Sequence, residues 1–361
     1  MQFETVPFLK LSPVRQEVRV AIDAVLNKGV FMNGDYVHKF KIDFSKYLQL
    51  NHIVPTANCT DALEIILRSL GIQETDEVIT TSFSWFSDAS VIQIVGASIV
   101  FCDIDITHFG LNISDFENRI TSKTKAIILP HLFGMVHPDV QKIASICREK
   151  KIILIEDCAQ AHGATLNGKL AGTFGDITAF SFYPTKNLAA LGDAGAIATN
   201  NEFLATKCQL WANHGQVTRN EHLQLGRNSR MDELQAAVLT ANLGFLDSDN
   251  EHRRELAKIY FDVLQDVECS LPLKIEGHVY HQFVLRTKRR DELQKFLIGR
   301  GIETDIHYPK ALSDMKIFEK NEKFLSASLA SDTILSLPIH PSHTKQEIDY
   351  VAQTIKRFFR G

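Results

Sequence analysis

TKAIILP (residues 124–130) and IILIED (residues 152–157) are the two stretches that decide the fold. Both are almost continuously apolar over the length of a strand, which is typical of strands buried in a parallel sheet. Between them, Pro138 opens a segment whose apolar residues recur at helical spacing. A strand, a helix and a second strand in this order predict a βαβ unit, and hence a parallel sheet covered by helices.

The same alternation of strands and helices extends through the first two thirds of the chain. Further strands are predicted over residues 77–81, 98–103, 178–183 and 195–199, and helices over residues 14–27 and 61–70. We therefore predict an α/β fold with a large, mostly parallel sheet domain over residues 1–248. The sequence leaves open whether the helix at residues 14–27 packs on a second domain.

The pattern changes beyond about residue 250, where charged helices alternate with isolated strands. Helices are predicted over residues 251–265 and 291–299, strands over residues 280–285 and 302–307, and a final helix from Lys345. These elements predict a smaller C-terminal α+β domain over residues 249–361.

Composition and charge argue against several classes of protein. The chain has 361 residues, a formal net charge of -4 and 45% hydrophobic residues, so no dedicated surface for nucleic acid or an anionic membrane is expected. No apolar stretch has the length of a signal-peptide core or a membrane span. The 6 cysteines are scattered without a Cys-x-x-Cys pair, which favours reduced thiols and a cytoplasmic location.

Two polar residues follow predicted strands in positions suited to chemistry. Asp157 ends a buried strand, where ligands of open α/β sheets bind, although a lone aspartate there can also cap the next helix. Lys186 lies in the turn SFYPTK (residues 181–186), where Ser181 offers a hydroxyl to a phosphate. A turn lysine is usually solvated, but burial and nearby charge can lower its pKa until the amine bonds to an aldehyde cofactor.

Two further segments supply features of a site for a planar, phosphorylated cofactor. TANCTD (residues 56–61) directly precedes the core of a predicted helix, and N–H groups at a helix N-terminus bind phosphate. Asn58 or Thr60 can also simply cap that helix. Trp85 follows the strand at residues 77–81, and its indole can stack on a cofactor ring, although a single tryptophan more often belongs to a core.

One apparent phosphate-binding motif is rejected. GATLNGKL (residues 163–170) nearly matches a P-loop, but Leu170 has no hydroxyl to bind magnesium, so we predict a β-turn with a surface lysine. Histidines and cysteines do not cluster at metal-ligand spacing, and no catalytic metal is predicted. No Gly-x-Gly-x-x-Gly follows an early strand, which argues against a nicotinamide-dependent enzyme.

Four features of this chain occur in an order that resembles the DegT-type nucleotide-sugar aminotransferases. They are the phosphate-binding residues before a helix, the aromatic Trp85, the aspartate at a strand end and the lysine in a turn. The DegT-type proteins are fold type I pyridoxal 5'-phosphate (PLP) enzymes. The resemblance covers nearly the whole chain and is carried by VPF (6–8), EDCAQAHG (156–163), GRNSRMDELQAA (226–237) and HYP (307–309). It implies a PLP-dependent aminotransferase that acts as a homodimer with shared active sites.

The resemblance also implies a role for each candidate residue. Lys186 is the expected catalytic residue, which holds PLP covalently as a Schiff base and shuttles a proton. Asp157 pairs with the pyridine nitrogen and keeps it protonated, so that the ring acts as an electron sink. The other expected cofactor-binding residues are Thr60, Asp61 and Ser181 at the phosphate, Trp85 on the ring, Gln160 near the phenolic oxygen, and Asn228 at the phosphate of the neighbouring subunit.

The expected substrate follows from the stretch YPTKNLAALGDAG (residues 183–195). It resembles members of the family that aminate carbon 3 of a dTDP-linked 6-deoxyhexose, whereas members acting at carbon 4 more often carry Thr-Thr-Gly-Glu there. We expect dTDP-3-keto-6-deoxyhexose to be converted to dTDP-3-amino-3,6-dideoxyhexose with L-glutamate as amino donor, for a surface glycan such as the O-antigen of lipopolysaccharide.

Alternative functions remain open at this point. The chain could act at carbon 4, or on a UDP- or GDP-linked keto-sugar, or could be a non-catalytic regulatory protein that kept the PLP-enzyme fold. Related sugar dehydratases in which a histidine replaces the cofactor lysine are disfavoured, because Lys186 is present.

Overall fold

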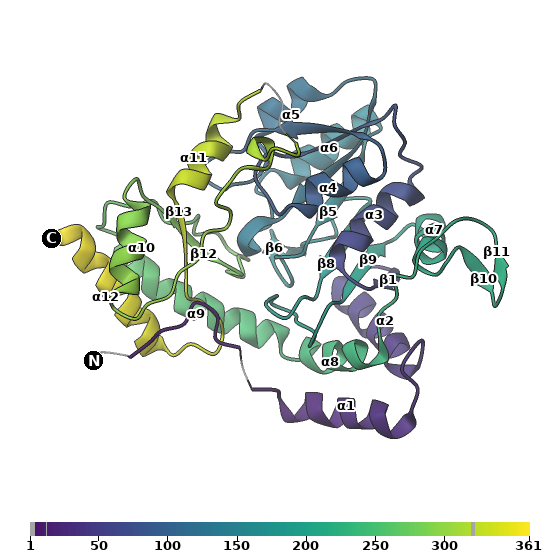
Figure 1. Ribbon diagram of the computed structural model, residues 1–361, viewed down its shortest axis with the longest axis horizontal. Helices are drawn as coiled ribbons and strands as arrows, with labels where there is room; N and C mark the ends of the chain where they lie inside the picture. Colours follow the sequence, from purple (N-terminus) through teal and green to yellow (C-terminus); the bar gives the residue numbers. More distant parts are fainter. Residues whose placement is uncertain (1–3, 12, 319–321) are drawn as a thin grey trace.

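The computed structural model describes residues 4–11, 13–318 and 322–361, and its centre is a seven-stranded sheet (Figure 1). The strand order is β1-β9-β8-β5-β4-β2-β3. Strands β8, β5, β4, β2 and β3 are parallel, whereas β9 is antiparallel to both of its neighbours. The bounds are β1 His52–Thr56, β2 Glu77–Thr81, β3 Ser98–Cys102, β4 Thr124–Pro130, β5 Ile153–Asp157, β8 Ile177–Ser181 and β9 Gly195–Thr199. The predicted mostly parallel sheet is confirmed.

Helices cover both faces of this sheet. Within β4, Ala126 and Ile128 join one hydrophobic core, and Ile127 and Leu129 join the other, because successive strand residues point to opposite faces. This two-sided burial explains the continuous apolar strands of the sequence. The first core includes α3 (Cys59–Ser69), α4 (Ser87–Ile94) and α7 (Glu202–Ala212), and the second includes α2 (Asp35–Leu48), α6 (Val140–Lys150) and α8 (Glu233–Leu243).

The C-terminal third is built around the antiparallel pair β12 (Phe283–Arg286) and β13 (Ile334–Leu337). Residues of α9 (Leu246–Leu264), α10 (Arg290–Ile298) and α12 (Lys345–Arg360) share a third core with this pair. We propose a domain boundary at residues 248–249, which lies within the first turn of α9. The remaining elements are α5 (Ile113–Arg119), α11 (Leu325–Thr333), the short helices η1 (Leu132–Gly134) and η2 (Leu312–Asp314), and two hairpins. The hairpins are β6 (Thr165–Leu166) with β7 (Lys169–Leu170), and β10 (Gln216–Thr218) with β11 (Glu221–His222).

The N-terminal segment crosses from the smaller domain to the larger one. Val6 belongs to the third core and forms an isolated bridge with Ile302. The following helix, α1 (Gln16–Lys28), packs on α8 instead of the small domain, through Ala21 and Val25. Figure 1 shows this path along the lower edge of the molecule.

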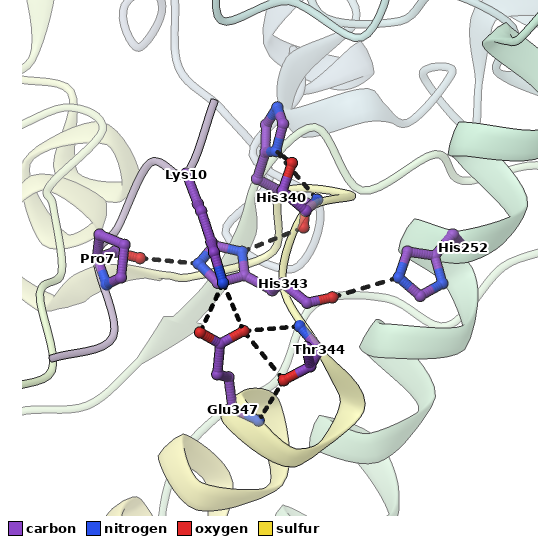
Figure 2. Close-up of polar contacts among 8 residues, drawn as sticks. Pro7, Lys10, His252, His340, His343, Thr344 and Glu347 are labelled. Atoms are coloured by element: carbon purple, nitrogen blue, oxygen red, sulfur yellow. Dashed lines mark hydrogen bonds and ion pairs between the residues drawn. The ribbon is translucent and has the colours of Figure 1, made fainter. Parts of the chain in front are cut away.

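Polar contacts fix the N-terminal segment to the start of α12 (Figure 2). Lys10 Nζ lies 2.8 Å from Glu347 Oε1, and His343 Nε2 lies 2.8 Å from the carbonyl oxygen of Pro7. Glu347 also completes a capping box with Thr344 at the N-terminus of α12. An N-cap of this kind typically stabilises a helix by about 1 kcal/mol. The ion pair with Lys10 therefore connects the N-terminal segment to an already well-formed helix start.

Two local predictions have different outcomes. The strand expected over residues 302–307 is not formed, because Ile302 bridges to Val6 while Asp305 bridges to Ser336, so the segment changes partner after a single pair. The β-turn expected within residues 163–170 is confirmed: β6 (Thr165–Leu166) and β7 (Lys169–Leu170) form a hairpin with an exposed Lys169. In the described part of the chain, no helix combines the length and apolar character needed to cross a membrane.

Candidate active site

A cavity of about 720 Å³ opens at the carboxyl ends of β2, β4, β5 and β8. This edge of an open α/β sheet is where ligands generally bind. The small domain and the N-terminal segment supply the facing wall, with Phe8, Leu9, Arg253, His281, His307, Tyr308 and His340. The cavity therefore lies between the two domains, and both are needed to enclose it.

Most of the residues predicted from the sequence meet in this cavity. Thr60, Trp85, Asp157, Gln160, Ser181 and Lys186 all line it. They come from the start of α3, the segment before α4, and the ends of β5 and β8 with the loops that follow them. Residues that are more than 100 positions apart in the sequence are thus adjacent, because parallel strands end at the same edge of the sheet.

The start of α3 forms a cup suited to a phosphate. Asn58 caps the helix by accepting a hydrogen bond from the N–H of Asp61 at 2.8 Å. Among the described residues, no acceptor is present for the backbone N–H groups of Cys59 and Thr60. The Thr60 hydroxyl lies 2.7 Å from the Ser87 hydroxyl. Free N–H groups and hydroxyls at a helix N-terminus are the donors that bind a phosphate.

Gly195 allows the chain to approach the cup closely. A Cβ atom at this position would lie 2.4 Å from the carbonyl carbon of Asn58 and 2.8 Å from the nitrogen of Cys59. Both neighbours are backbone atoms and cannot move aside without distorting the cup. Glycine at the first position of β9 is therefore required by the shape of the cup.

Two predicted residues lie outside the cavity. The N–H of Asp61 is used by the Asn58 cap, and its carboxylate forms an ion pair with Arg227 at 2.9 Å. Asn228 is exposed and accepts a hydrogen bond from Arg230 Nε at 3.0 Å. It lines a separate hollow with Met32, Ala57, Asp193, Arg230, Asp232 and Gln235. Within one chain, neither Asp61 nor Asn228 reaches the cavity that contains Lys186.

Lys186 is held in a tight turn after β8. Its N–H donates to the carbonyl of Tyr183 at 2.8 Å, and the next residue, Asn187, donates to Asn250 Oδ1 at 2.7 Å. Burial lowers the pKa of the Lys186 amine below its usual value, although Asp157 and other nearby groups act in the opposite direction. A lowered pKa leaves more of the amine neutral and able to attack a carbonyl carbon.

Asp157 and Gln160 are oriented by defined partners. Asp157 Oδ1 accepts a hydrogen bond from the N–H of Ala159 at 2.8 Å. Gln160 accepts from the N–H of Phe133 at 2.7 Å and donates to the Tyr308 hydroxyl at 2.8 Å. The exposed Trp85 ring lies 5.9 Å from the Tyr308 ring, centroid to centroid. These contacts hold a carboxylate, an amide and an indole around one space.

A buried cluster beneath the cavity has a structural role. His131, Glu156 and Cys158 offer ligand atoms within 4.8 Å of one another. The Glu156 carboxylate is already bonded to His131 Nε2 at 2.8 Å and to the N–H groups of Gly172, Phe174 and Gly175. With these donors, the carboxylate fixes the loop that precedes β8, and we assign it no metal.

Several cavity residues were not among the predicted site residues. Arg253, His281 and His340 come from the smaller domain. Asp88, in α4, does not line the cavity but is hydrogen-bonded to Ser84, which does. Burial lowers the pKa of His281 well below its usual value, which favours the neutral imidazole. The sequence indicates one of these residues: Arg253 is a charged residue on the apolar face of α9, beside Leu256 and Tyr260.

The donor set fits PLP. The Lys186 amine, whose pKa is lowered, suits the aldehyde, and the Asp157 carboxylate suits the pyridine nitrogen. The free N–H groups at the start of α3 suit the phosphate, and the exposed indole of Trp85 suits the ring. The close approach at Gly195 keeps the phosphate cup open to such a group. The arrangement can therefore hold PLP with Lys186 at the aldehyde and Asp157 at the far end of the ring.

Comparison with known proteins supports this assignment. Residues 14–356 match the DegT/DnrJ/EryC1/StrS aminotransferase family. The chain is 39% identical to the pleiotropic regulatory protein of Geobacillus stearothermophilus, over 98% of this chain and 99% of that one. It is 38% identical to the dTDP-3-amino-3,6-dideoxy-alpha-D-galactopyranose transaminase of Aneurinibacillus thermoaerophilus, again over 98% and 99%.

A further relative and a solved structure extend the comparison. The UDP-N-acetyl-3-dehydro-alpha-D-glucosamine 3-aminotransferase of Acidithiobacillus ferrooxidans is 36% identical over 97% of this chain and 96% of its own. The crystal structure of DesV from S. venezuelae superimposes with a TM-score of 0.96 at 34% identity, covering 99% of both chains. The chain therefore belongs to the DegT/DnrJ/EryC1/StrS aminotransferase family and is a PLP-dependent sugar aminotransferase.

Proposed function

We propose that the enzyme transfers the amino group of L-glutamate to carbon 3 of a dTDP-3-keto-6-deoxyhexose. The products are dTDP-3-amino-3,6-dideoxyhexose, destined for a surface glycan such as an O-antigen, and 2-oxoglutarate. The observation that carries the aminotransferase chemistry is the presence of Lys186 and Asp157 in one cavity. The name of the relative from A. thermoaerophilus supports the dTDP nucleotide and carbon 3.

The cavity residues predicted from the sequence each have a proposed part in this reaction. When bound, PLP supplies an electron sink that stabilises negative charge on the carbon losing its proton. Lys186 would hold the cofactor through its amine, and the same amine would move the proton. Asp157 holds a proton on the pyridine nitrogen, and Gln160 is placed for the phenolic oxygen. Thr60, Ser181 and the helix N–H groups bind the phosphate, and Trp85 covers the ring.

The proposed substrate can be tested with a panel of keto-sugars. With L-glutamate as donor, we expect dTDP-3-keto-6-deoxyhexose to be aminated at least about tenfold faster, as kcat/KM, than a dTDP-4-keto sugar or a 4-keto UDP or GDP sugar. The physical reason is that a fixed nucleotide site brings only one carbonyl carbon to the cofactor. Fast conversion of a 4-keto sugar, without conversion of the 3-keto sugar, would overturn the carbon-3 assignment and leave the aminotransferase chemistry intact.

The nucleotide is tested by the same approach. The relative from A. ferrooxidans is named for a UDP sugar, so a 3-keto UDP sugar is the informative competitor. Preference for the UDP sugar would support amination at carbon 3 but would mean that the nucleotide is UDP instead of dTDP. A regulatory role without catalysis, suggested by the name of the relative from G. stearothermophilus, requires that no sugar of the panel is converted.

We also propose that the enzyme is a homodimer whose active sites are shared. Apolar side chains are exposed along α1 and the residues after it, notably Val20, Leu26 and Phe31. Leu223 and Leu225 are exposed near the hairpin β10–β11, which projects away from the sheet in Figure 1. Large exposed apolar side chains on these two parts of the chain support a protein interface there. Asn228, which does not reach the cavity of its own chain, would then complete the phosphate cup of the partner.

Mixed dimers provide the test of sharing. If the sites are shared, Lys186→Ala subunits combined with Asn228→Ala subunits give one site with both changes and one site with neither. At limiting PLP we expect the purified heterodimer to show about half the activity of the unmodified dimer, and far more than the homodimer of either variant. The measurement is turnover of purified heterodimers carrying two different tags. If activity stays at or below half that of the Asn228→Ala homodimer, Asn228 acts within its own subunit.

A further inference from the structure

Asp88 is a carboxyl group with no route to solvent. It is the second residue of α4, and none of its surface is exposed. One carboxyl oxygen, Oδ2, makes a hydrogen bond with the Ser84 hydroxyl. The other oxygen, Oδ1, is buried and meets no N–H or hydroxyl donor. An ionised carboxylate left in this state would be strongly unfavourable, because nothing replaces the water that it loses.

The neighbour of Asp88 is the candidate cofactor-binding carboxylate. Asp157 faces Asp88, and a hydrogen bond between the two side chains, which needs a proton on one of them, is among the causes that raise the pKa of Asp88. No described lysine, arginine or histidine lies at ion-pair distance from Asp88. The other titratable groups that face it are Lys186, from the loop after β8, Cys59, from α3, and Tyr308, from the small domain. Burial, followed by repulsion from Asp157, raises the pKa of Asp88 well above its usual value.

The two carboxyl groups differ in the donors around them. Asp157 accepts a backbone N–H from Ala159 at 2.8 Å, and the Cys59 thiol lies 3.8 Å from the same oxygen. Asp88 has only the Ser84 hydroxyl besides its partner carboxyl. When two carboxyl groups in contact share one proton, it resides on the group whose charged form is less stabilised. That group is Asp88.

We propose that Asp88 is a positioning residue that keeps its proton and donates it in a hydrogen bond to Asp157. The Asp157 carboxylate is then held between this proton and the N–H of Ala159, and the pair carries a single negative charge. This inference rests on the proposed pairing of Asp157 with the pyridine nitrogen of PLP. A single negative charge matches the single positive charge of a protonated pyridine, so the two carboxyl groups and the ring nitrogen together carry no net charge.

The first test observes the proton directly in the holoenzyme. The infrared spectrum of the unmodified enzyme minus that of Asp88→Asn should contain the carbonyl stretching band of a protonated carboxyl group near neutral pH. If the difference spectrum shows only the bands of an ionised carboxylate, Asp88 is charged and the proposal is wrong. This measurement does not depend on turnover.

The second test uses the visible absorption band of the bound cofactor. Exchanging a neutral carboxyl for a neutral amide should move the pH midpoint of this band by less than about 0.3 unit, whereas removal of a buried negative charge would move it by about 1 unit or more. Asp88→Ala, which lacks any donor, should weaken PLP binding at least about tenfold, and Asp88→Asn should restore it to within about threefold. If both variants lose PLP affinity equally, Asp88 acts only through packing and the proposal is wrong.

A matched control and a reference experiment separate the possible failures. Asp76→Asn makes the same change at a buried carboxyl group in the turn before β2, outside the cavity, and should alter neither the midpoint nor the affinity. If the unmodified enzyme shows no cofactor band at all, the proposed function fails. If that band is present but the Asp88→Asn midpoint moves by about a unit, only the inference about Asp88 fails.

Discussion

Replacing Lys186 by alanine is expected to abolish turnover and the covalent attachment of PLP. The amine both bonds to the cofactor and carries the proton, and no other lysine lines the cavity among the described residues. Because both functions are removed together, we expect kcat to fall by on the order of a thousandfold or more. The purified unmodified enzyme should be yellow, with an absorption band that borohydride reduction abolishes. The variant should lack that borohydride-sensitive band.

Lys169 provides a matched control for this substitution. It is an exposed lysine in the β6–β7 hairpin, with its ammonium group 4.6 Å from the Phe174 ring centroid. Lys169→Ala should retain the absorption band and turnover. Near-normal turnover of Lys186→Ala would refute the central assignment, and circular dichroism would show whether either variant has lost its fold.

Replacing Asp157 by asparagine should preserve the fold and remove most of the activity. An amide cannot hold a proton on the pyridine nitrogen. An ion pair at about 4 Å contributes roughly 4 kcal/mol in a partly screened site, equivalent to about three pKa units on the pyridine. Without that proton the ring stabilises negative charge poorly, and we expect kcat to fall at least about a hundredfold. Steady-state kinetics at saturating PLP provide the measurement.

The outcome for Asp157→Asn also separates catalysis from binding. The amide oxygen can still accept the N–H of Ala159, which is bonded to Asp157 at 2.8 Å, so the loop should keep its shape. The loss should therefore be mainly in kcat, with a smaller change in KM for the sugar. Turnover equal to that of the unmodified enzyme would mean that Asp157 does not face the pyridine nitrogen.

The sheet of the large domain was predictable because its strands are buried on both faces. Two-sided burial produced the apolar runs that end at Pro130 and Asp157, and β2, β4 and β9 have the predicted bounds. The helix α2 was not predicted, although Phe40, Phe44 and Leu48 recur at intervals of four on its buried face. Strands β1 and β13 were also not predicted, because Pro55 interrupts the apolar run of β1 and β13 has only four residues.

The site was predictable only where its residues follow parallel strands. Asp157 and Lys186 could be brought together from sequence because neighbouring strands end at one edge. The wall formed by His281, Tyr308 and His340 depends on how the small domain docks, which no local pattern encodes. Asp88 illustrates the same limit, since nothing in its flanking residues indicates that a second carboxyl group lies against it.

The N-terminal segment makes the junction between the two domains a double one. The chain joins the two domains once at the start of α9 and again on the N-terminal side of α1, where Val6, Pro7 and Lys10 contact the small domain. A rigid body attached at two points can turn only about the line that joins them. We therefore expect motion of the small domain to be limited mainly to rotation about that line. A bulky fusion partner placed before Val6 adjoins one of the two attachments, whereas one placed after α12 does not. We therefore expect the first fusion to disturb small-domain motion more than the second.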